Sequence, residues 1–524
     1  MAQYNTKTVK RATTKMVNHQ GGNSYKISPK LELISILAAG FGNTYYEKLT
    51  DREIRFKDLV NEISKTDAEF VAKAMVYARS VIGQRTATHF GAVALTPSLS
   101  GMELGKRFFS KRNRKVNKGG IIYRLDDMLE IVACYQHFNP GKPLPASMKK
   151  GFKLALEKAD TYELAKYQGK GKSVSLVDVV NLVHPHPTAE MTETFKALMS
   201  GDLKQFNTVE DKNTSAGQEV AKKVKEGKIT KAEAEVELTQ SKKENFAELV
   251  DTKKIGYLAL LRNLRNIIIN DASADMIGKV SNLLTDETFV RKSLVFPHQI
   301  DIAMEVLVTD KVKVPTKLLQ ALNSAYELSI PNLAELFPSG KTAVVIDTSG
   351  SMFGGYSGMK MNGKSINKSP IQKAALIGAT LAKGIDADFF QFGRTCEKIN
   401  YNPIDSYNTI KKYALSQEGR VGHDTRFNEI FKTLNSGGYD RIFIVSDLQG
   451  GDTIIGNSEY SNYVTTNGKP MIYTIDLCGY GSTMFKQDKN LVQLFGYGSD
   501  IYEMAKKVEI DPKALLKEIE AIEI

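Results

Sequence analysis

The stretch AVVIDTSGS, residues 343–351, joins a run of apolar residues to a carboxylate and two hydroxyl side chains. A short apolar run bounded by turn residues is typical of a buried strand. Further stretches alternate in the same way, with strands expected at 389–392, 441–445 and 471–477 and helices at 371–384, 404–415 and 425–435. This alternation predicts an α/β part with a doubly wound parallel sheet, in which ligands bind beyond the carboxyl ends of the strands.

Oxygen-bearing side chains follow two of these strands. Asp347, Ser349 and Ser351 alternate along the chain, so one carboxylate and two hydroxyls can point toward a common position. Asp447 follows the strand that begins at Arg441, and a parallel sheet brings it to the same edge. Ligands made of oxygen alone favour a hard cation, Mg²⁺ first, with Mn²⁺ or Ca²⁺ as alternatives. A capping turn without a metal is the competing interpretation.

These residues resemble the von Willebrand A domain family and its metal-ion-dependent adhesion site. The resemblance implies that Asp347, Ser349 and Ser351 form the first group of ligands for Mg²⁺. It also implies that Thr425 is the second ligand and Asp447 the third. One position departs from the family, because Asp424 precedes Thr425 where the family usually has a Gly-Gly-Thr turn.

Residues 358–365, GMKMNGKS, match the phosphate-binding P-loop pattern GxxxxGKS. A P-loop follows its strand directly and opens a helix. Here ten residues separate Asp347 from Gly358, and Pro370 interrupts the stretch after Ser365. The context favours a chance match in an exposed loop over an NTPase that acts through Lys364.

The composition of the 524-residue chain is that of an ordinary globular protein. Its length exceeds what one hydrophobic core supports, so at least two domains are expected. No window reaches the roughly 18 apolar residues that a membrane span needs, and the N-terminus lacks the apolar stretch of a secretory signal peptide. The three cysteines are far apart and lack metal-ligand spacing. We expect a cytoplasmic protein without a disulfide framework and without a membrane partner.

The excess positive charge lies in one part of the chain. Residues 341–524 contain 21 basic and 21 acidic residues, so the preceding residues hold 50 basic against 38 acidic ones. A neutral second part and a basic first part predict different partners, and the first part is expected to face a polyanion.

Residues 30–335 show one stretch of helical periodicity after another. Two of the apolar stripes are Met148, Phe152, Ala155 and Ala159, and Leu258, Leu261, Leu264, Ile267 and Ile268. Their succession predicts an α-solenoid, although no repeat of fixed period occurs. The segment 210–248 is dense in Lys and Glu and predicts an exposed helical hairpin or a mobile excursion.

Basic residues gather in three places within this helical part. The longest run contains no acid and includes Lys106, Arg107, Lys111, Arg112, Arg114, Lys115, Lys118 and Arg124, interleaved with Phe108, Phe109 and Tyr123. The two shorter clusters are Lys149, Lys150 and Lys153, and Lys166, Lys170 and Lys172. Such density favours a nearby polyanion, with a solvated surface patch as the alternative.

The helical part resembles the TROVE module of the Ro autoantigen family and its bacterial and phage relatives. The residues that carry the resemblance are 31–37, 42–46, 144–145 with 149–151, 164–167 and 260–264. The order of TROVE module and von Willebrand A domain is also that of the family. We therefore expect a basic N-terminal segment at 1–29, a TROVE domain at 30–338 and a von Willebrand A-like domain at 339–524. Residues 210–248 and 360–369 look like departures from the family.

The resemblance implies a monomeric ring of HEAT-like helical repeats that the von Willebrand A domain closes. In the family, single-stranded ends of misfolded non-coding RNAs enter the central hole, and small Y RNAs bind the outer surface. The family's Y-RNA contacts match Lys166, Lys170 and His184 here, and His186 competes for the last role. The basic run at 106–124 is expected to bind unpaired RNA ends.

The function expected from these observations is RNA binding without catalysis. The RNAs would be Y-like RNA and aberrant non-coding RNA, which the chain would hold or present to an exoribonuclease. The alternative is a protein-adhesion module that uses the metal to capture an acidic side chain of a partner. No arrangement of catalytic acids, bases or nucleophiles rises above background in the sequence, so we expect no enzymatic activity.

Overall fold

The computed structural model places most of the chain. The described residues are 15–113, 115–203, 220, 223–224, 226, 228–293, 295, 297–330, 336–337, 339–354, 360–361, 364–365, 369–402, 404–452, 458–486, 489–498 and 500–524. The chain divides into two compact units. The first consists of Met1–Asp160, Tyr167–Thr192 and Asn332–Ile524, and the second of Thr161–Lys166 and Glu193–Pro331.

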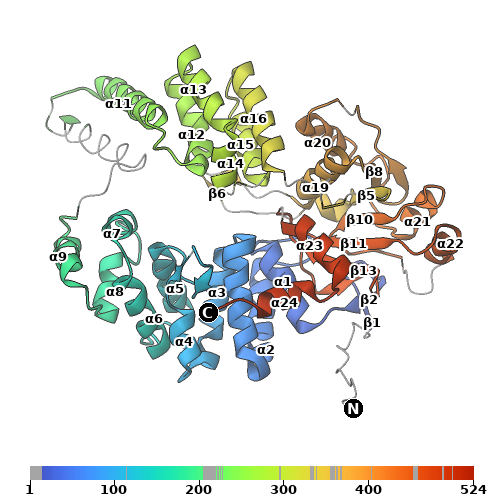
Figure 1. Cartoon of the computed structure of the whole chain (residues 1–524), viewed down its shortest axis with the longest axis horizontal. Coiled ribbons are helices and arrows are strands. Elements are labelled where there is room, and N and C mark those ends of the chain that lie inside the picture. The colour runs from blue at the N-terminus through green and yellow to red at the C-terminus, as the bar shows by residue number, and fades with distance from the viewer. Residues whose placement is uncertain are drawn as a thin grey trace. The chain divides into compact units, whose positions relative to one another are not determined.

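A six-stranded sheet forms the centre of the C-terminal part (Figure 1). In spatial order its strands are β13 (Leu491–Phe495), β11 (Met471–Asp476), β10 (Arg441–Ser446), β5 (Thr342–Asp347), β8 (Asp388–Phe392) and β9 (Cys396–Lys398). All pairs are parallel except β8 with β9. The four strands expected from the sequence are confirmed, and β5 and β10 lie side by side where the strand order reverses. In doubly wound sheets this reversal is the place where ligands bind.

Helices cover both faces of this sheet. They are α18 (Gly350–Phe353), α19 (Pro370–Ile385), α20 (Tyr407–Leu415), α21 (Asn428–Leu434), α22 (Ser458–Asn467), α23 (Asp500–Ile510) and α24 (Ala514–Glu520). Ala343 and Val345 of β5 join the core beneath α21, while α19 packs on β5, β8 and β10. Helices cover both faces of such a strand, so the side chains on both faces are buried and apolar. This explains why the sequence of the strand is an unbroken apolar run. The helices expected at 371–384, 404–415 and 425–435 are confirmed within a few residues.

The first unit also contains most of the N-terminal helices. They are α1 (Pro29–Ala39), α2 (Leu49–Tyr77), α3 (Thr86–Leu95), α4 (Glu103–Phe108), α5 (Leu125–Phe138), α6 (Ala146–Glu157) and α8 (Leu176–Val183). The stripe Met148, Phe152, Ala155 and Ala159 is buried, as its spacing predicts. Because α1 packs against β13 and α2 against α24, the start of the helical part and the sheet share one compact unit.

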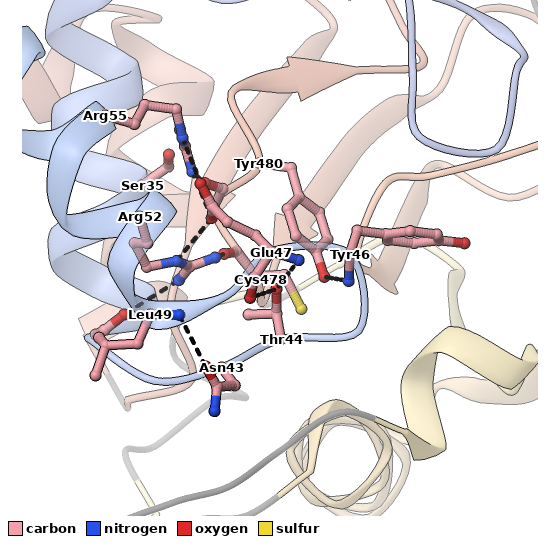
Figure 2. Close-up of polar contacts among 12 residues, drawn as sticks. Ser35, Asn43, Thr44, Tyr46, Glu47, Leu49, Arg52, Arg55, Cys478 and Tyr480 are labelled. Atoms are coloured by element: carbon pink, nitrogen blue, oxygen red, sulfur yellow. Dashed lines mark hydrogen bonds and ion pairs between the residues drawn. The ribbon is translucent and has the colours of Figure 1, made fainter.

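An ion-pair network holds the loop between α1 and α2 against the loop that follows β11 (Figure 2). The Arg52 guanidinium donates to Cys478 O at 2.6 Å and to Gly40 O at 3.1 Å, and it pairs with Glu47 at 2.8 Å. Arg55 pairs with the same Glu47 at 2.8 Å and donates to Gly479 O at 2.8 Å. The network therefore fixes the α1–α2 loop, including Tyr46, beside the carboxyl end of the sheet.

Residues 15–26 form two strands that the sequence did not reveal. Strand β1 (Lys15–Val17) pairs with β2 (Asn23–Lys26), and β2 pairs with β12 (Ser482–Thr483). The segment 1–29 was expected only as a basic extension. Its described part instead completes a three-stranded sheet with the C-terminal half of the chain.

The second unit is helical. It contains α7 (Thr161–Lys166), α9 (Thr192–Ser200), α11 (Lys231–Asp251), α12 (Tyr257–Asn270), α13 (Ala274–Leu284), α14 (Glu287–Ser293), α15 (Pro297–Thr309) and α16 (Thr316–Ser329). The first residue of α9, Thr192, is assigned to the first unit. In α12, four residues of the expected stripe, Leu261, Leu264, Ile267 and Ile268, are buried, and Leu258 is half-buried. Helix α11 starts at a capping box in which Thr230 and Glu233 exchange hydrogen bonds. It supplies the predicted helix of the Lys- and Glu-rich segment 210–248, whereas residues 210–219, 221–222, 225 and 227 of that segment lie outside the described residues.

Within the described ranges, no helix has both the length and the apolar character needed to cross a membrane.

Candidate functional site

The five residues expected at the metal centre have buried side chains at the carboxyl ends of β5 and β10. They are Asp347, Ser349, Ser351, Thr425 and Asp447, none more than 4% exposed. Asp347 is the last residue of β5, and its Oδ2 accepts a hydrogen bond from Ser446 Oγ of β10 at 2.6 Å. The hydroxyl oxygens of Ser349 and Ser351 lie 3.3 Å apart. The alternation of the DxSxS stretch thus places its hydroxyls together, as expected.

The two carboxylates of the centre are electrostatically unfavourable in the protein alone. Burial raises the pKa of Asp347 to about 6. Burial, together with the charge of Asp347, raises the pKa of Asp447 well above its ordinary value. The Oδ2 atom of Asp447 is buried and has no hydrogen-bond partner among the described residues. Burying a carboxylate oxygen without a hydrogen-bond donor costs free energy of folding. A cation bound to this oxygen would offset that cost.

The backbone around Asp447 is shaped to present its carboxylate. Leu448 has a φ of 56°, a strained conformation for a bulky side chain. The turn lets Gln449 N donate to Asp447 Oδ1 at 3.0 Å, which leaves the other oxygen available. Strain of this kind persists where the surrounding structure enforces it, often at functional sites.

The turn that carries Thr425 is tied to the first ligand group. Gly350 N donates to His423 O at 3.1 Å, and Thr425 itself is 1% exposed. Asp424, which departs from the family's Gly-Gly-Thr turn, points away and pairs with Arg394 at 3.1 Å. The substitution of a glycine by Asp424 therefore leaves the buried position of Thr425 intact.

The donor set fits a hard cation. It consists of two carboxylates and three hydroxyls, all oxygen donors of the type that Mg²⁺ and Mn²⁺ accept. In the part of the chain that the structure describes, no three His, Cys, Asp or Glu side chains come together as a metal cluster. The donor atoms of the five residues are all oxygens, whereas zinc sites are built mainly from His nitrogen and Cys sulfur.

Two further residues, Gln20 and Tyr46, lie at this centre and were not predicted from the sequence as part of it. Gln20 Nε2 donates to Thr425 Oγ1 at 2.9 Å. The hydroxyl of Tyr46 lies near Gln20 and Ser351, which both influence its pKa. Both residues come from segments far away in sequence, so local spacing did not indicate them, and the stretch 42–46 that contains Tyr46 pointed only to the TROVE resemblance.

The match to a P-loop is not supported by the backbone. Lys364–Ser365 form strand β7, which pairs antiparallel with β6 (Lys360–Met361). A P-loop would instead open a helix at this point. The sequence context had already favoured a chance match, and Gly358 and Gly363 lie outside the described residues.

The basic run at 106–124 differs in part from its predicted role. Phe108 and Phe109 are fully buried, so the expectation that these aromatic residues interleave with the bases to meet RNA is wrong. The Phe109 ring packs edge-to-face on Phe152 of α6, 5.8 Å away. Tyr123 lies under the Arg79 guanidinium at 5.0 Å. The aromatic positions of this run stabilise the core and the loop instead of presenting stacking surfaces.

Arg112 of the same run is 2% exposed. Its guanidinium donates to the carbonyl oxygens of Asn117 and Gly119, so it holds the loop that contains them. Burial lowers the pKa of this guanidinium. Arg112 therefore acts first as a structural residue, and Arg114 lies outside the described residues.

Other basic residues of the run contact neighbouring parts of the chain. Lys106 pairs with Glu103 at 3.3 Å, and Lys118 with Glu523 at 2.6 Å. Arg107 and Lys111 donate to the backbone oxygens of Ile524 and Lys158, both at 3.2 Å. Lys115 and Lys150 are exposed, and Lys149 is half-buried. RNA binding by these residues remains a prediction.

The three residues matched to Y-RNA contacts are all exposed. Lys166 belongs to the second unit, where its Nζ donates to Tyr162 Oη at 3.0 Å. Lys170 and His184 belong to the first unit and flank α8. His184 ends this helix with a φ of 46°, a left-handed conformation in which glycine or asparagine is more common. His186 is exposed too, and its N–H donates to Glu157 Oε1 at 2.9 Å.

Comparisons with known proteins agree with this architecture. Residues 228–335 match the family model of the TROVE domain. Among solved structures, the crystal structure of the Ro (RSR) protein of Deinococcus radiodurans is similar, with a TM-score of 0.56 and 15% sequence identity. The match covers 92% of this chain and 100% of that chain. The chain has a Ro-like fold. No curated protein matches the sequence.

The Ro-like fold and the TROVE match confirm the resemblance drawn from the sequence. Of the stretches that carried it, 260–264 falls within the matched residues. The expectation that 210–248 departs from the family is wrong for 228–248, because the TROVE match begins at residue 228. The charged helix α11 thus lies within the residues that match the TROVE model.

Proposed function

We propose that this chain is an RNA-binding protein of the Ro type. The observation that carries the proposal is the TROVE match at 228–335 within a Ro-like fold. The excess of basic residues before residue 341 supports it, because phosphate contacts from Lys and Arg dominate RNA affinity. The proposed ligands are a Y-like RNA and the ends of misfolded non-coding RNA, bound by the monomeric protein.

A wider role follows from this proposal. The chain holds aberrant RNA or presents it to an exoribonuclease and has no catalytic activity of its own. Its proposed location is the cytoplasm, where three reduced cysteines are the normal state.

The metal centre supports a second proposed function that is compatible with the first. Asp347, Ser349, Ser351, Thr425 and Asp447 would hold Mg²⁺, and the unpartnered Asp447 Oδ2 favours such an ion. When bound, the ion supplies a Lewis-acid position that an acidic side chain of a partner protein can fill. The chain's own residues would orient the ion, and the burial of all five would limit the access of solvent to it.

RNA affinity is expected to depend steeply on salt. Binding that neutralises about three phosphates gives a slope of roughly −2 to −3 in a plot of log affinity against log salt concentration. The affinity of the full chain for a stem-loop RNA should therefore fall more than about tenfold between 50 and 200 mM salt. Filter binding at several salt concentrations measures this slope. A slope near zero would contradict binding through phosphates.

The two proposed RNA sites are expected to respond to different substitutions. Replacing Lys170 and His184 with alanine should weaken binding of a Y-like stem-loop by about 1–3 kcal/mol, the range for losing charge-assisted hydrogen bonds. Binding of RNA with a free single-stranded tail should change much less. Lys115→Ala with Lys150→Ala should show the reverse preference. These exposed lysines are better probes of the second site than Arg112, which is buried.

Competition between the two RNAs at fixed salt measures these effects for each double variant. Lys313→Ala with Lys57→Ala removes two charges from other exposed positions and serves as the control. Equal losses for both RNAs in both variants would show one continuous electrostatic surface and would remove the two-site proposal.

A further inference from the structure

A tight turn at Asn18–Gly22 joins β1 to β2. Asn18 N donates to Gly22 O at 2.9 Å, and Gly21 N donates to Asn18 O at 3.0 Å. The Asn18 side chain stabilises the turn from inside, because its Oδ1 accepts from Gln20 N at 2.9 Å and from Gly22 N at 3.2 Å. The turn is therefore a formed structure with Gln20 at its tip.

The turn is attached to the loop that carries Asp447. Asn18 Nδ2 donates to Gly450 O at 2.9 Å, and His19 N donates to Gln449 Oε1 at 3.0 Å. A Cβ atom at Gly22 would lie 2.1 Å from Gly450 O, a distance that no side chain tolerates. Glycine at position 22 thus permits a close approach between the N-terminal turn and this loop.

This attachment places the Gln20 carboxamide at the candidate centre. Its Nε2 donates to Thr425 Oγ1 at 2.9 Å, and Thr425 is one of the five proposed ligands. The oxygen and nitrogen of a glutamine amide exchange places by rotation about the last side-chain bond. A carboxamide oxygen is a ligand that hard cations accept.

A second element closes over the same position. The Tyr46 ring stacks on His19 of the turn, with centroids 5.2 Å apart and planes at 8°. The pKa of Tyr46 is raised to about 12, chiefly by burial; hydrogen bonds with Gln20 and Ser351 lower it and the charge of Asp447 raises it within that net shift. Tyr46 belongs to the α1–α2 loop. The ion pair of Arg52 with Glu47 and the hydrogen bond from Arg52 to Gly40 O hold this loop in place (Figure 2).

We infer that Gln20 is an additional ligand of the metal centre and fills the coordination position that an acidic side chain of a partner would take. The inference rests on the metal centre proposed above. A side chain of the protein itself would then occupy the coordination position of the partner's carboxylate. Binding of that carboxylate would require the Asn18–Gly22 turn to move away from the metal centre. The rival explanation is that Gln20 is a structural residue that only hydrogen-bonds Thr425.

Manganese binding to the full chain separates these explanations. Mn²⁺ replaces Mg²⁺ in oxygen sites, electron paramagnetic resonance measures its Kd, and water-proton relaxation measures the number of waters on the bound ion. Gln20→Ala should weaken Mn²⁺ binding by about tenfold and add one bound water. Gln20→Glu keeps an oxygen at this position and should retain or strengthen binding. Gln240→Ala, an exposed glutamine on α11, is the matched control.

A second variant tests the position of Gln20 without changing Gln20 itself. Gly22→Ala should push the turn away from Gly450 without altering Gln20, and it should also weaken Mn²⁺ binding and add a bound water. Acetate, a probe for an acidic side chain, should displace water from Mn²⁺ at lower concentration in Gln20→Ala than in the parent protein.

The outcomes distinguish the role of Gln20 from the existence of the metal centre. Equal Mn²⁺ affinity and equal hydration in the parent protein and Gln20→Ala would overturn the role of Gln20 while leaving the centre itself in place. Absence of Mn²⁺ binding in both proteins would overturn the metal centre and the inference together.

Discussion

Arg52→Met is expected to lower the free energy of unfolding by about 3–5 kcal/mol, the cost of removing one partner from a buried ion pair. Arg52 is 1% exposed and joins Glu47, Gly40 O and Cys478 O. Burial alone would raise the pKa of Glu47, yet the pKa lies below its ordinary value because Arg55 and Arg52 stabilise the charged form. Methionine preserves much of the side-chain length but leaves the two carbonyl oxygens without their donor.

Chemical denaturation of the full chain, followed by circular dichroism, measures this loss. Lys57→Met is the control, because Lys57 is exposed on the same helix and its replacement should change stability by less than about 0.5 kcal/mol. If Arg52→Met behaved like the control, the network in Figure 2 would not stabilise the contact between the α1–α2 loop and the loop after β11.

The parts of the site that the sequence predicted depend on short-range relations. Asp347, Ser349 and Ser351 occur within five residues after an apolar run, so strand and ligands could be inferred together. Asp447 followed from the rule that parallel strands bring their carboxyl ends to one edge. The register confirms this rule, because Val445 of β10 lies opposite Ile346 of β5.

The missing parts depend on contacts between distant segments. Gln20 and Thr425 are 405 positions apart, and β2 pairs with a strand that begins at Ser482. Strands of three or four residues, such as β1 and β2, show no apolar periodicity that distinguishes them from a polar extension. The burial of Phe108, Phe109 and Arg112 was missed for a related reason, since a dense run of charges masks the few positions that face the core.

Mg²⁺ is expected to stabilise the full chain against heat, because the ion binds the folded centre and not the unfolded chain. At a Mg²⁺ concentration one hundred times the Kd, the gain is about 2.7 kcal/mol. The raised pKa values of Asp347 and Asp447 set the pH dependence. Without metal, a raised carboxyl pKa means that the folded state retains protons longer, so stability falls as the pH rises toward the folded pKa. Protons compete with Mg²⁺ for the pair, and the gain in Tm should therefore be larger at pH 8 than at pH 5.

Thermal melts with and without excess Mg²⁺ test this expectation in three proteins. Asp347→Ala should abolish the gain in Tm, because it removes the carboxylate at the end of β5. Asp424→Asn should retain the gain, since this neighbour of Thr425 pairs with Arg394 at the surface instead of facing the buried hydroxyls. A gain that survives in Asp347→Ala would place the ion elsewhere on the chain. An unchanged melt of the parent protein in excess Mg²⁺ would instead mean that the Asp347–Asp447 pair is relieved by protonation alone, and the adhesion function proposed for this centre would be withdrawn.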